Sequence, residues 1–300
     1  MNTIKLLTIF AFCAAATSAA AAQPRIRIDE GREVLDLDRL PALRPRVKGE
    51  SVQGMAICNG HMFVLYHGGA CAVINLENSA VEGEFTVEAA AGTHCNNVSF
   101  GVEFAEEGSR FPLLYISECN APSRCFVTDI SAEGASSIAT IRYAGSGIAE
   151  FCDWCVDREN RHLYAYGKTP QGGAVLKRFA LPTLAEMRAA RGDVVLGDSD
   201  VLWQCVYDSG FFRIPQGSCI RNGYIYLPTG VPRVCSCHIH IVDLSSGERV
   251  ERIDIDGIRL EPEGICPVGE EIMLMFGSSG SSGRLRAFEI GPGSYADQKL

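Results

Sequence analysis

The feature of this sequence that most constrains its fold is a short motif that recurs along the chain. The sequence QGMAICNG at 53–60 returns as QGSCIRNG at 216–223 and as EGICPVG at 263–269, and an apolar segment follows each copy at once. Looser copies occur at 96–101 and 152–157. Repeated units of this kind cannot bury their apolar faces alone, so they are expected to stack on one another.

A second recurring sequence pattern supports the same division of the chain into repeats. In four repeats an apolar segment ends in a polar residue followed by an aliphatic one: VINL at 73–76, VTDI at 127–130, IVDL at 241–244 and AFEI at 287–290. The third repeat has a weaker copy, RFAL at 178–181, with alanine in place of the polar residue. Runs rich in Val, Ile, Tyr and Phe alternate with turn residues, which is typical of short strands. The clearest runs lie at 61–66, 112–116, 162–166, 224–227 and 272–276, and one helical stretch lies at 182–191.

Repeats of about 40 to 60 residues that each hold several short strands are typical of a β-propeller. We therefore predict an all-β, five-bladed propeller with repeats near 53–88, 94–143, 150–212, 216–256 and 262–290. The recurring motif forms the inner strand of each blade, and the outer strands are expected at 81–87, 136–142, 200–206 and 249–254. Six blades are the alternative, if residues 184–215 form a small blade of their own.

The last repeat lacks an outer strand, whereas the amino-terminal region 24–38 has alternating segments at 25–29 and 33–37 that belong to no repeat. We predict that one of these segments completes the last blade. Such pairing would close the ring and remove an exposed strand edge.

The first 22 residues are typical of a cleaved secretory signal, with a basic start, a short apolar run and small residues that end at Ala22. We therefore expect a secreted or periplasmic, monomeric protein whose residues 23–300 form a single propeller domain. No stretch reaches the roughly 18 apolar residues of a membrane span. The net charge of −9, without a cluster of Lys and Arg, argues against binding to nucleic acid.

Inner strands of a propeller converge on its axis, so the first residues of each strand meet at the channel mouth. In this chain those positions are polar: Gln53, His94, Asn96, Asn97, Asp153, Gln216 and Glu263. Convergent polar groups in a concave mouth are the default binding-site hypothesis, and a small molecule or glycan is the expected ligand. Trp154 could stack on a sugar ring, with packing in the core as its alternative. The polar residues could instead only satisfy free backbone groups at the blade tops.

The blade motifs QGMAI at 53–57, DWCVDRENRHLYAY at 153–166 and EPEGICPVGEEIMLMF at 261–276 resemble those of gluconolactonase- and NHL-type propellers. The resemblance covers nearly all of the chain after residue 22 and implies the propeller fold. In gluconolactonase-type enzymes an inner-strand glutamate binds a divalent metal together with Asn and Asp from other blades. By this resemblance Glu263, Asn96 or Asn97, and Asp153 would hold a divalent cation such as calcium.

Two enzymatic hypotheses accompany the binding hypothesis. Asp153 and Glu263 lie on different blades, so one carboxyl could act as acid and the other as base or nucleophile in glycoside hydrolysis. Alternatively, Glu263, His94, Asp153 and an Asn could hold a hard divalent cation that activates water or polarises a lactone or ester. A binding protein is favoured because no complete catalytic set is visible, and a protein-interaction platform is the third class. Whether the chain is an enzyme stays open.

The cysteines are mostly expected to be structural. Cys119 and Cys125 flank a turn between two strands, which predicts a disulfide across that hairpin. Cys155, Cys219 and Cys266 occupy the same position in three repeats, as expected for thiols in the core. In CSCHIH at 235–240 the cysteines and histidines would face opposite sides of a strand, so they could not surround one ion.

Overall fold

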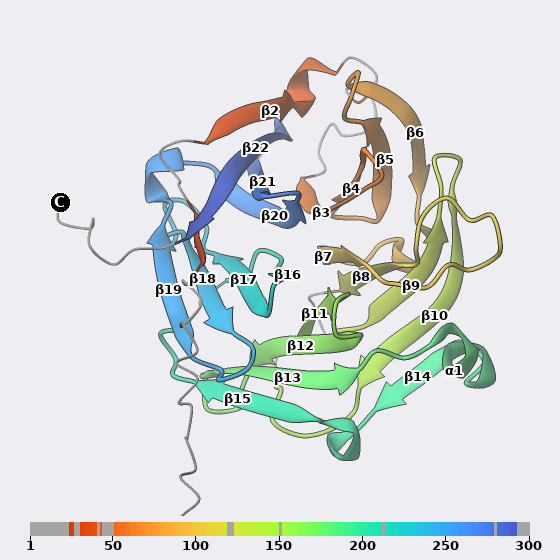
Figure 1. Cartoon of the computed structure of the whole chain (residues 1–300), viewed down its shortest axis with the longest axis vertical. Helices are drawn as coiled ribbons and strands as arrows, with labels where there is room; N and C mark the ends of the chain where they lie inside the picture. The colour runs from red at the N-terminus through yellow and green to blue at the C-terminus, as the bar shows by residue number, and fades with distance from the viewer. Residues whose placement is uncertain are drawn as a thin grey trace, which may run out of the picture.

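Five small sheets are arranged as the blades of a ring around a central axis (Figure 1). The computed structural model describes residues 24–26, 31–40, 43, 51–118, 123–149, 152–211, 214–278 and 281–292. The predicted five-bladed, all-β fold is confirmed, and the six-bladed alternative is wrong because residues 193–196 join the second blade. The predicted signal segment 1–22 lies outside the described residues.

In each blade consecutive strands pair antiparallel from the axis outward. Blade 1 contains β3 (Val52–Cys58), β4 (His61–Tyr66), β5 (Ala70–Asn75) and β6 (Ala80–Thr86). Blade 2 contains β7 (Cys95–Phe100), β8 (Leu114–Glu118), β9 (Cys125–Ile130), β10 (Ala135–Tyr143) and β14 (Asp193–Leu196), an additional outer strand that is parallel to β10. Blade 3 contains β11 (Cys152–Asp157), β12 (His162–Lys168), β13 (Ala174–Ala180) and β15 (Trp203–Tyr207). Blade 4 contains β16 (Cys219–Arg221), β17 (Tyr224–Thr229), β18 (His238–Asp243) and β19 (Arg249–Asp254).

Blade 5 contains β20 (Glu261–Val268), β21 (Glu271–Ser278) and β22 (Ser281–Pro292), and the amino-terminal region completes it. Both β1 (Pro24–Ile26) and β2 (Arg32–Asp36) pair antiparallel with β22. The predicted ring closure is therefore confirmed, with two amino-terminal strands taking part where one was expected. An ion pair between Arg32 and Glu271, 2.7 Å long, also joins the closing strand β2 to β21.

The turn inside the recurring motif has the backbone that its sequence requires. Asn59 and Gly60, which join β3 to β4, have φ values of 49° and 73°, and Asn222 and Gly223 repeat them in blade 4 with 50° and 78°. Two successive residues with positive φ form the tight hairpin turn that Asn-Gly favours. The motif thus ends an inner strand and reverses the chain into the second strand of the same blade.

The hydrophobic core is divided into five clusters, and each lies mainly between two neighbouring blades. Between blades 2 and 3, for example, Tyr115 and Val127 pack with Trp154, Leu163 and Phe179. This arrangement explains why the second strands are apolar on both faces: each blade is covered on both sides. Stacking of the repeats, the basis of the fold prediction, is what buries the core.

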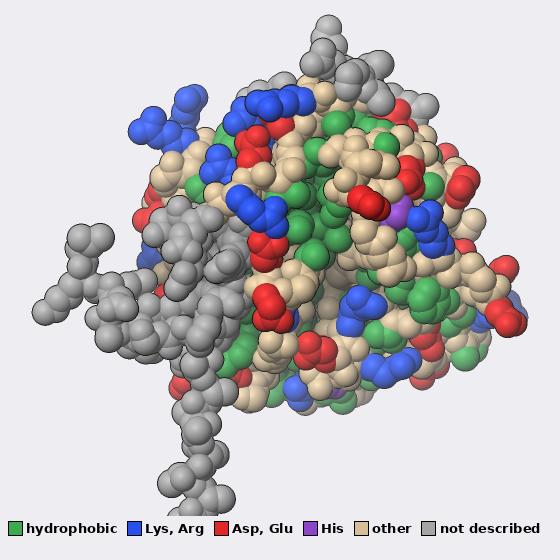
Figure 2. Space-filling model, turned by 45° about the horizontal axis from the view of Figure 1, so that its top comes forward, with side chains coloured by type: hydrophobic (Ala, Val, Ile, Leu, Met, Phe, Trp, Pro, Cys, Tyr) green, Lys and Arg blue, Asp and Glu red, His purple; other side chains and the backbone are tan. Residues whose placement is uncertain are grey.

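On the face seen in Figure 2, basic and acidic side chains are interspersed without a dominant sign of charge, and hydrophobic side chains lie between them. Large hydrophobic side chains that are exposed among the described residues are Phe104, Val195, Leu202, Val206 and Val234. Within the described ranges, no helix has the length and apolar character needed to cross a membrane.

The predicted helical insertion near 182–191 is confirmed as α1 (Leu184–Ala189), between β13 and β15 of blade 3. Thr183 and Glu186 form a capping box: the Thr183 hydroxyl accepts from the Glu186 amide at 3.2 Å, and the Glu186 carboxylate accepts from the Thr183 amide at 2.8 Å. Met187 anchors the helix in the core between blades 2 and 3. After the helix, β14 pairs parallel with β10 of blade 2, so the insertion bridges two blades.

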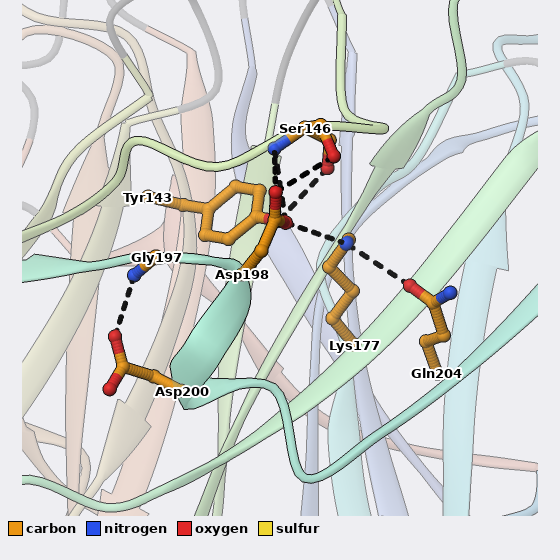
Figure 3. Close-up of polar contacts among 7 residues, drawn as sticks. All are labelled: Tyr143, Ser146, Lys177, Gly197, Asp198, Asp200 and Gln204. Atoms are coloured by element: carbon orange, nitrogen blue, oxygen red, sulfur yellow. Dashed lines mark hydrogen bonds and ion pairs between the residues drawn. The ribbon is translucent and has the colours of Figure 1, made fainter.

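A polar cluster fastens the end of this insertion (Figure 3). The Asp198 carboxylate accepts hydrogen bonds from the Tyr143 hydroxyl and from the backbone amide and hydroxyl of Ser146. The buried Lys177 ammonium lies 3.8 Å from the same carboxylate and donates to the Gln204 side chain at 3.1 Å. These contacts connect blade 2, blade 3 and the insertion, which indicates a structural role.

Candidate functional site

Polar side chains from all five blades are buried around the amino-terminal ends of the inner strands. They are Gln53 on β3, Asn96 and Asn97 on β7, Asp153 on β11, Gln216 just before β16, and Glu263 on β20. These are residues that the sequence placed at the channel mouth, and we call them the polar ring. Hydrogen bonds connect these residues to one another and to their neighbours in separate groups.

Asn97 connects three blades. Its amide nitrogen donates to the Trp154 carbonyl at 2.7 Å and to the Ser218 hydroxyl at 2.9 Å, and its amide oxygen accepts from the Ser218 backbone at 3.0 Å. Both ends of the amide are thus engaged with protein groups. For Asn97 the geometry supports the structural alternative, in which a polar side chain satisfies backbone groups at the blade tops.

Asp153 is fully buried beside Asn96, whose amide nitrogen donates to the Asp153 carboxyl group. Burial raises the pKa of Asp153 to about 7, although hydrogen bonds from Asn96, Ser117 and Tyr166 lower it. Desolvation outweighs those bonds because it penalises the charged form of a carboxyl group. Near neutral pH, Asp153 is therefore able both to donate and to accept a proton.

Glu263 is 3% exposed, and its Oε2 atom has no hydrogen-bond partner among the described residues. Burial raises the pKa of Glu263 well above its ordinary value, and the negative charge of Glu261 raises it further. Glu261 itself accepts a hydrogen bond from Gln216 at 2.7 Å. This shift favours the protonated form of Glu263, a carboxylic acid that can donate one hydrogen bond and accept others.

Gln53 of the polar ring forms a further group with His94, which the sequence also placed at the channel mouth and which lies just before β7. The Nε2 atom of His94 lies 2.9 Å from Oε1 of Gln53, and Nε2 of Gln53 donates to the Ser51 hydroxyl at 3.2 Å. The ring of His94 packs against that of His67, with centroids 4.2 Å apart. Burial lowers the pKa of His94, and the neighbouring His67 lowers it further, which favours the neutral imidazole.

Sequence reasoning missed several neighbours of the polar ring, namely His67, Ser117, Tyr166, Ser218 and Glu261. Glu261 could have been predicted, because it lies two residues before Glu263 in the same strand and therefore faces the same side. Tyr166 and Ser117 lie on the second strands of blades 3 and 2, and nothing local in the sequence relates them to Asp153.

Trp154 was expected to bind ligand or to pack in the core, and the structure places it in the core. Its indole is 1% exposed and donates from Nε1 to the Ser123 carbonyl at 3.0 Å. The ring packs near Phe179 between blades 2 and 3. Side-chain direction alternates along a strand, so Trp154 points away from the side that Asp153 occupies. A ligand-stacking role for Trp154 is therefore corrected to core packing.

Ten cysteines, Cys125 among them, form no disulfide within the part of the chain that the structure describes. Cys119 lies outside the described residues, so its pairing with Cys125 stays a prediction. Burial raises the pKa of the Cys125 thiol, and the charge of Asp153 raises it further.

The calcium site implied by the family resemblance does not fit this geometry. Calcium requires oxygen ligands. Asn96, however, directs its amide nitrogen to Asp153, whose carboxyl group is engaged by that bond. Within the described ranges, no group of three or more His, Cys, Asp or Glu side chains is placed to hold a metal ion. We derive no chemistry from a metal at the polar ring.

His240, in the segment CSCHIH, is buried away from the polar ring. It is 2% exposed on β18 and stacks on Phe211, with ring centroids 4.8 Å apart. Burial lowers the pKa of His240 to about 3, and the neighbouring charges of Arg249, His238 and Arg252 lower it further. His240 therefore stays neutral in the folded protein at pH values where it becomes charged in the unfolded chain.

This difference predicts a loss of stability in mild acid. Between pH 6.5 and 3 the unfolded chain binds a proton at His240 that the folded protein does not, so the free energy of unfolding falls as the pH falls. His240→Phe keeps an aromatic ring against Phe211 and should remove about 1 kcal/mol of the stability difference between pH 7.5 and 5.5. Urea unfolding of both proteins at both pH values measures this; equal pH dependences would contradict the prediction.

Comparisons with known proteins support the fold and give no family. No protein-family model matches the chain, and no curated protein matches it. Among solved structures, glutaminyl cyclase from Myxococcus xanthus is similar in fold, with a TM-score of 0.54 and 13% identity over 89% of this chain and 97% of that chain. Hydrazine synthase from Kuenenia stuttgartiensis is more distant, with a TM-score of 0.41 and 14% identity over 74% of this chain and 61% of that chain.

Proposed function

We propose that this protein binds a small, neutral, polar molecule such as a sugar at the polar ring, with Glu263 as the main anchor. The observation that carries the proposal is the buried Oε2 atom of Glu263, which has no hydrogen-bond partner among the described residues. Leaving such a group unpaired costs about 1–3 kcal/mol or more. A ligand that completes its hydrogen bonds would recover part of this cost. We also propose that the protein is exported, because residues 1–22 are typical of a secretory signal.

The charge state of the ring favours a neutral ligand. Burial raises the pKa of Glu263 well above its ordinary value and that of Asp153 to about 7, which favours the protonated form of both carboxyl groups. These groups offer hydrogen-bond donors as well as acceptors, which suits hydroxyl and carbonyl groups. A ligand carboxylate would be repelled by Glu261, and the part of the chain that the structure describes has no Lys or Arg among the members of the ring.

Two variants of Glu263 test the binding proposal. Glu263→Gln retains a hydrogen-bond donor and the shape of the protonated acid, so it should bind ligand within a few-fold of wild type. Glu263→Leu removes the polar atoms and should weaken binding by roughly 10–100-fold. Thermal-shift screening with mono- and oligosaccharides, polyols and amides would find the ligand, and calorimetry would measure both variants. Equal affinity of wild type and Glu263→Leu would refute the role of Glu263.

A second candidate function is acid–base catalysis at the same ring. It is favoured by the pKa of about 7 at Asp153, because a catalytic acid or base works best with a pKa near the ambient pH. The fold relation to a glutaminyl cyclase is analogy only, yet it adds glutaminyl cyclisation to the lactone and glycoside hydrolysis worth assaying. Glutamine at 263 cannot transfer a proton, so loss of turnover with retained binding in Glu263→Gln would identify an enzyme.

A further inference from the structure

The recurring motif places different kinds of residue at successive levels of the channel. The first residue of a copy, such as Gln53 or Glu263, belongs to the polar ring. The second residue is glycine in the three closest copies, at Gly54, Gly217 and Gly264. The fourth residue is Ala56, Ser99, Cys155, Cys219 or Cys266, and all five line one cavity of about 80 Å³. A strand rises about 3.3 Å per residue, so this cavity lies roughly 10 Å along the channel from the first residue.

The glycines narrow the channel between the polar ring and the cavity. A Cβ atom on Gly54 would lie only 2.5 Å from Cγ2 of Val98 in blade 2. A Cβ atom on Gly264 would lie 3.0 Å from the backbone nitrogen of Met55 in blade 1. Gly217, whose φ is 85°, comes close to the Cα atom of Gly264. Glycine in these strands thus permits a close approach of neighbouring backbones, and the cavity is a compartment separate from the proposed binding site.

The wall of the cavity is mainly apolar. One large apolar side chain comes from the inner strand of each blade: Ile57, Phe100, Val156, Ile220 and Ile265. The wall also includes two serines, whose hydroxyl oxygens already have protein partners. Ser99 accepts from the Val156 backbone amide at 3.2 Å, and Ser218 accepts from the Asn97 side chain at 2.9 Å. The described wall has no carboxylate or imidazole group.

Arg158 is the charged residue of the described wall, and it is exposed to solvent. It directly follows β11, so it lies at the end of the inner strands opposite to the polar ring. None of the ion pairs among the described residues involves Arg158. Arg221, at the same end of β16, is instead paired with Glu270 at 3.1 Å. The cavity therefore opens away from the polar ring, beside a positive charge that has no ion-pair partner in the described part of the chain.

We propose that this cavity binds a short aliphatic carboxylate, with the carboxylate group at Arg158 and the hydrocarbon tail inside. A guanidinium group can form two parallel hydrogen bonds with a carboxylate, and an apolar wall favours the burial of CH₂ groups. An apolar cavity of roughly 150 Å³ accepts benzene, so the cavity of about 80 Å³ has room for about three carbon atoms. Butyrate, with three carbon atoms beyond its carboxylate group, is the expected best fit.

Titration of the full-length protein with straight-chain carboxylates, followed by ligand-observed NMR, tests the size of the site. Affinity should rise roughly fourfold with each CH₂ group from acetate through propionate to butyrate. It should not rise further at hexanoate, because the cavity is then full. The proposal is overturned if butyrate shows no saturable binding. It is also overturned if affinity keeps rising to hexanoate, because that trend indicates adsorption to the surface.

Two arginine variants test the charge. Arg158→Met keeps the length of the side chain and removes the guanidinium group, so it should bind butyrate about 10–100-fold more weakly, as expected for lost hydrogen bonds to a charged group. Arg161→Met is the matched control, because Arg161 lies in the same turn, is exposed and is not part of the described wall. It should bind butyrate as the wild type does. Equal affinity of wild type and Arg158→Met, or an equal loss in both variants, would contradict the role of Arg158.

A filling variant tests whether the tail enters the cavity. Ala56→Val adds two methyl groups to the wall, so butyrate should bind about 10-fold more weakly while acetate changes little. Circular dichroism before titration checks that the variant is folded. If it is not, Cys219→Val, at the same motif position in blade 4, makes the same test. Unchanged butyrate affinity in a folded filling variant would show that the tail lies elsewhere and would overturn the proposal.

Discussion

Replacement of Asp153 by asparagine is expected to stabilise the protein at pH 8 by about 3 kcal/mol. The carboxyl group is fully buried, and its pKa is about 7 in the folded protein against an ordinary value of 3.8. At about 1.4 kcal/mol per pH unit, this difference costs roughly 4 kcal/mol once the folded group is charged. Asparagine removes the charge but loses about 1 kcal/mol of hydrogen bonding with Asn96, Ser117 or Tyr166.

The pH dependence gives the sign of the effect. A carboxyl group whose pKa is raised in the folded state contributes stability below its unfolded pKa, and this contribution is lost as the pH rises through the folded pKa. The gain from Asp153→Asn should therefore be near zero or negative at pH 4 and grow up to about pH 7. Urea unfolding at pH 4, 6 and 8 measures it. The opposite contribution of His240 cancels when each variant is compared with wild type at the same pH.

Asp157 provides a matched control because it lies on the same strand and is also buried. Its carboxylate accepts from the backbone amides of Glu159 and Asn160, each at 3.1 Å, and from the Asn160 side chain at 2.9 Å. Asp157→Asn should therefore destabilise the protein by about 1 kcal/mol. If both variants, or neither, were more stable than the wild type, burial of the Asp153 charge would not be what lowers the stability of the folded protein. Natural proteins retain a destabilising buried charge mainly where a functional site needs it. The expected result would therefore support a functional role for Asp153.

The blades could be predicted because their signals are local. Asn59-Gly60 and Asn222-Gly223 specify tight turns, and the apolar runs that follow them match β4 and β17. Because the repeats must stack to bury their apolar faces, they are then predicted to form a ring of blades. The bridge formed by β14 was not predicted, because its short segment VVL at 194–196 pairs with a strand that lies about 50 residues earlier in the chain, and only tertiary contact decides that pairing.

The sequence predicted which residues lie in the polar ring, but not which hydrogen bonds they form. Register in the repeat places Gln53, Gln216 and Glu263 at equivalent positions, so their convergence follows from the fold. The hydrogen bonds of these residues depend on side-chain rotamers and on neighbours on the second strands, such as Tyr166. No local sequence pattern identifies those neighbours. Trp154 was ambiguous because a strand residue next to Asp153 faces either the axis or the neighbouring blade, and its large apolar area favoured the core.

Because Trp154 packs in the core, Trp154→Ala should lower the free energy of unfolding by about 3–5 kcal/mol: removing a buried aromatic ring leaves a cavity. The indole packs between blades 2 and 3 and donates to the Ser123 carbonyl, which would lose its partner. The loss should be similar from pH 5 to pH 8, since no titrating group is removed. Trp203, the other tryptophan of the chain, is half-buried on the outer strand β15 and provides the control.

Trp203→Ala should cost clearly less, about 1–2 kcal/mol, because its ring is already partly exposed at the edge of the core between blades 3 and 4, where the Arg178 guanidinium lies over it. Urea unfolding followed by circular dichroism compares the two variants without relying on tryptophan fluorescence. The reverse order of costs would contradict the core assignment of Trp154. A Trp154→Phe variant separates packing from ligand contact: it should recover part of the lost stability and leave ligand affinity unchanged, because a residue in the core between two blades reaches the polar ring only through the backbone it holds in place.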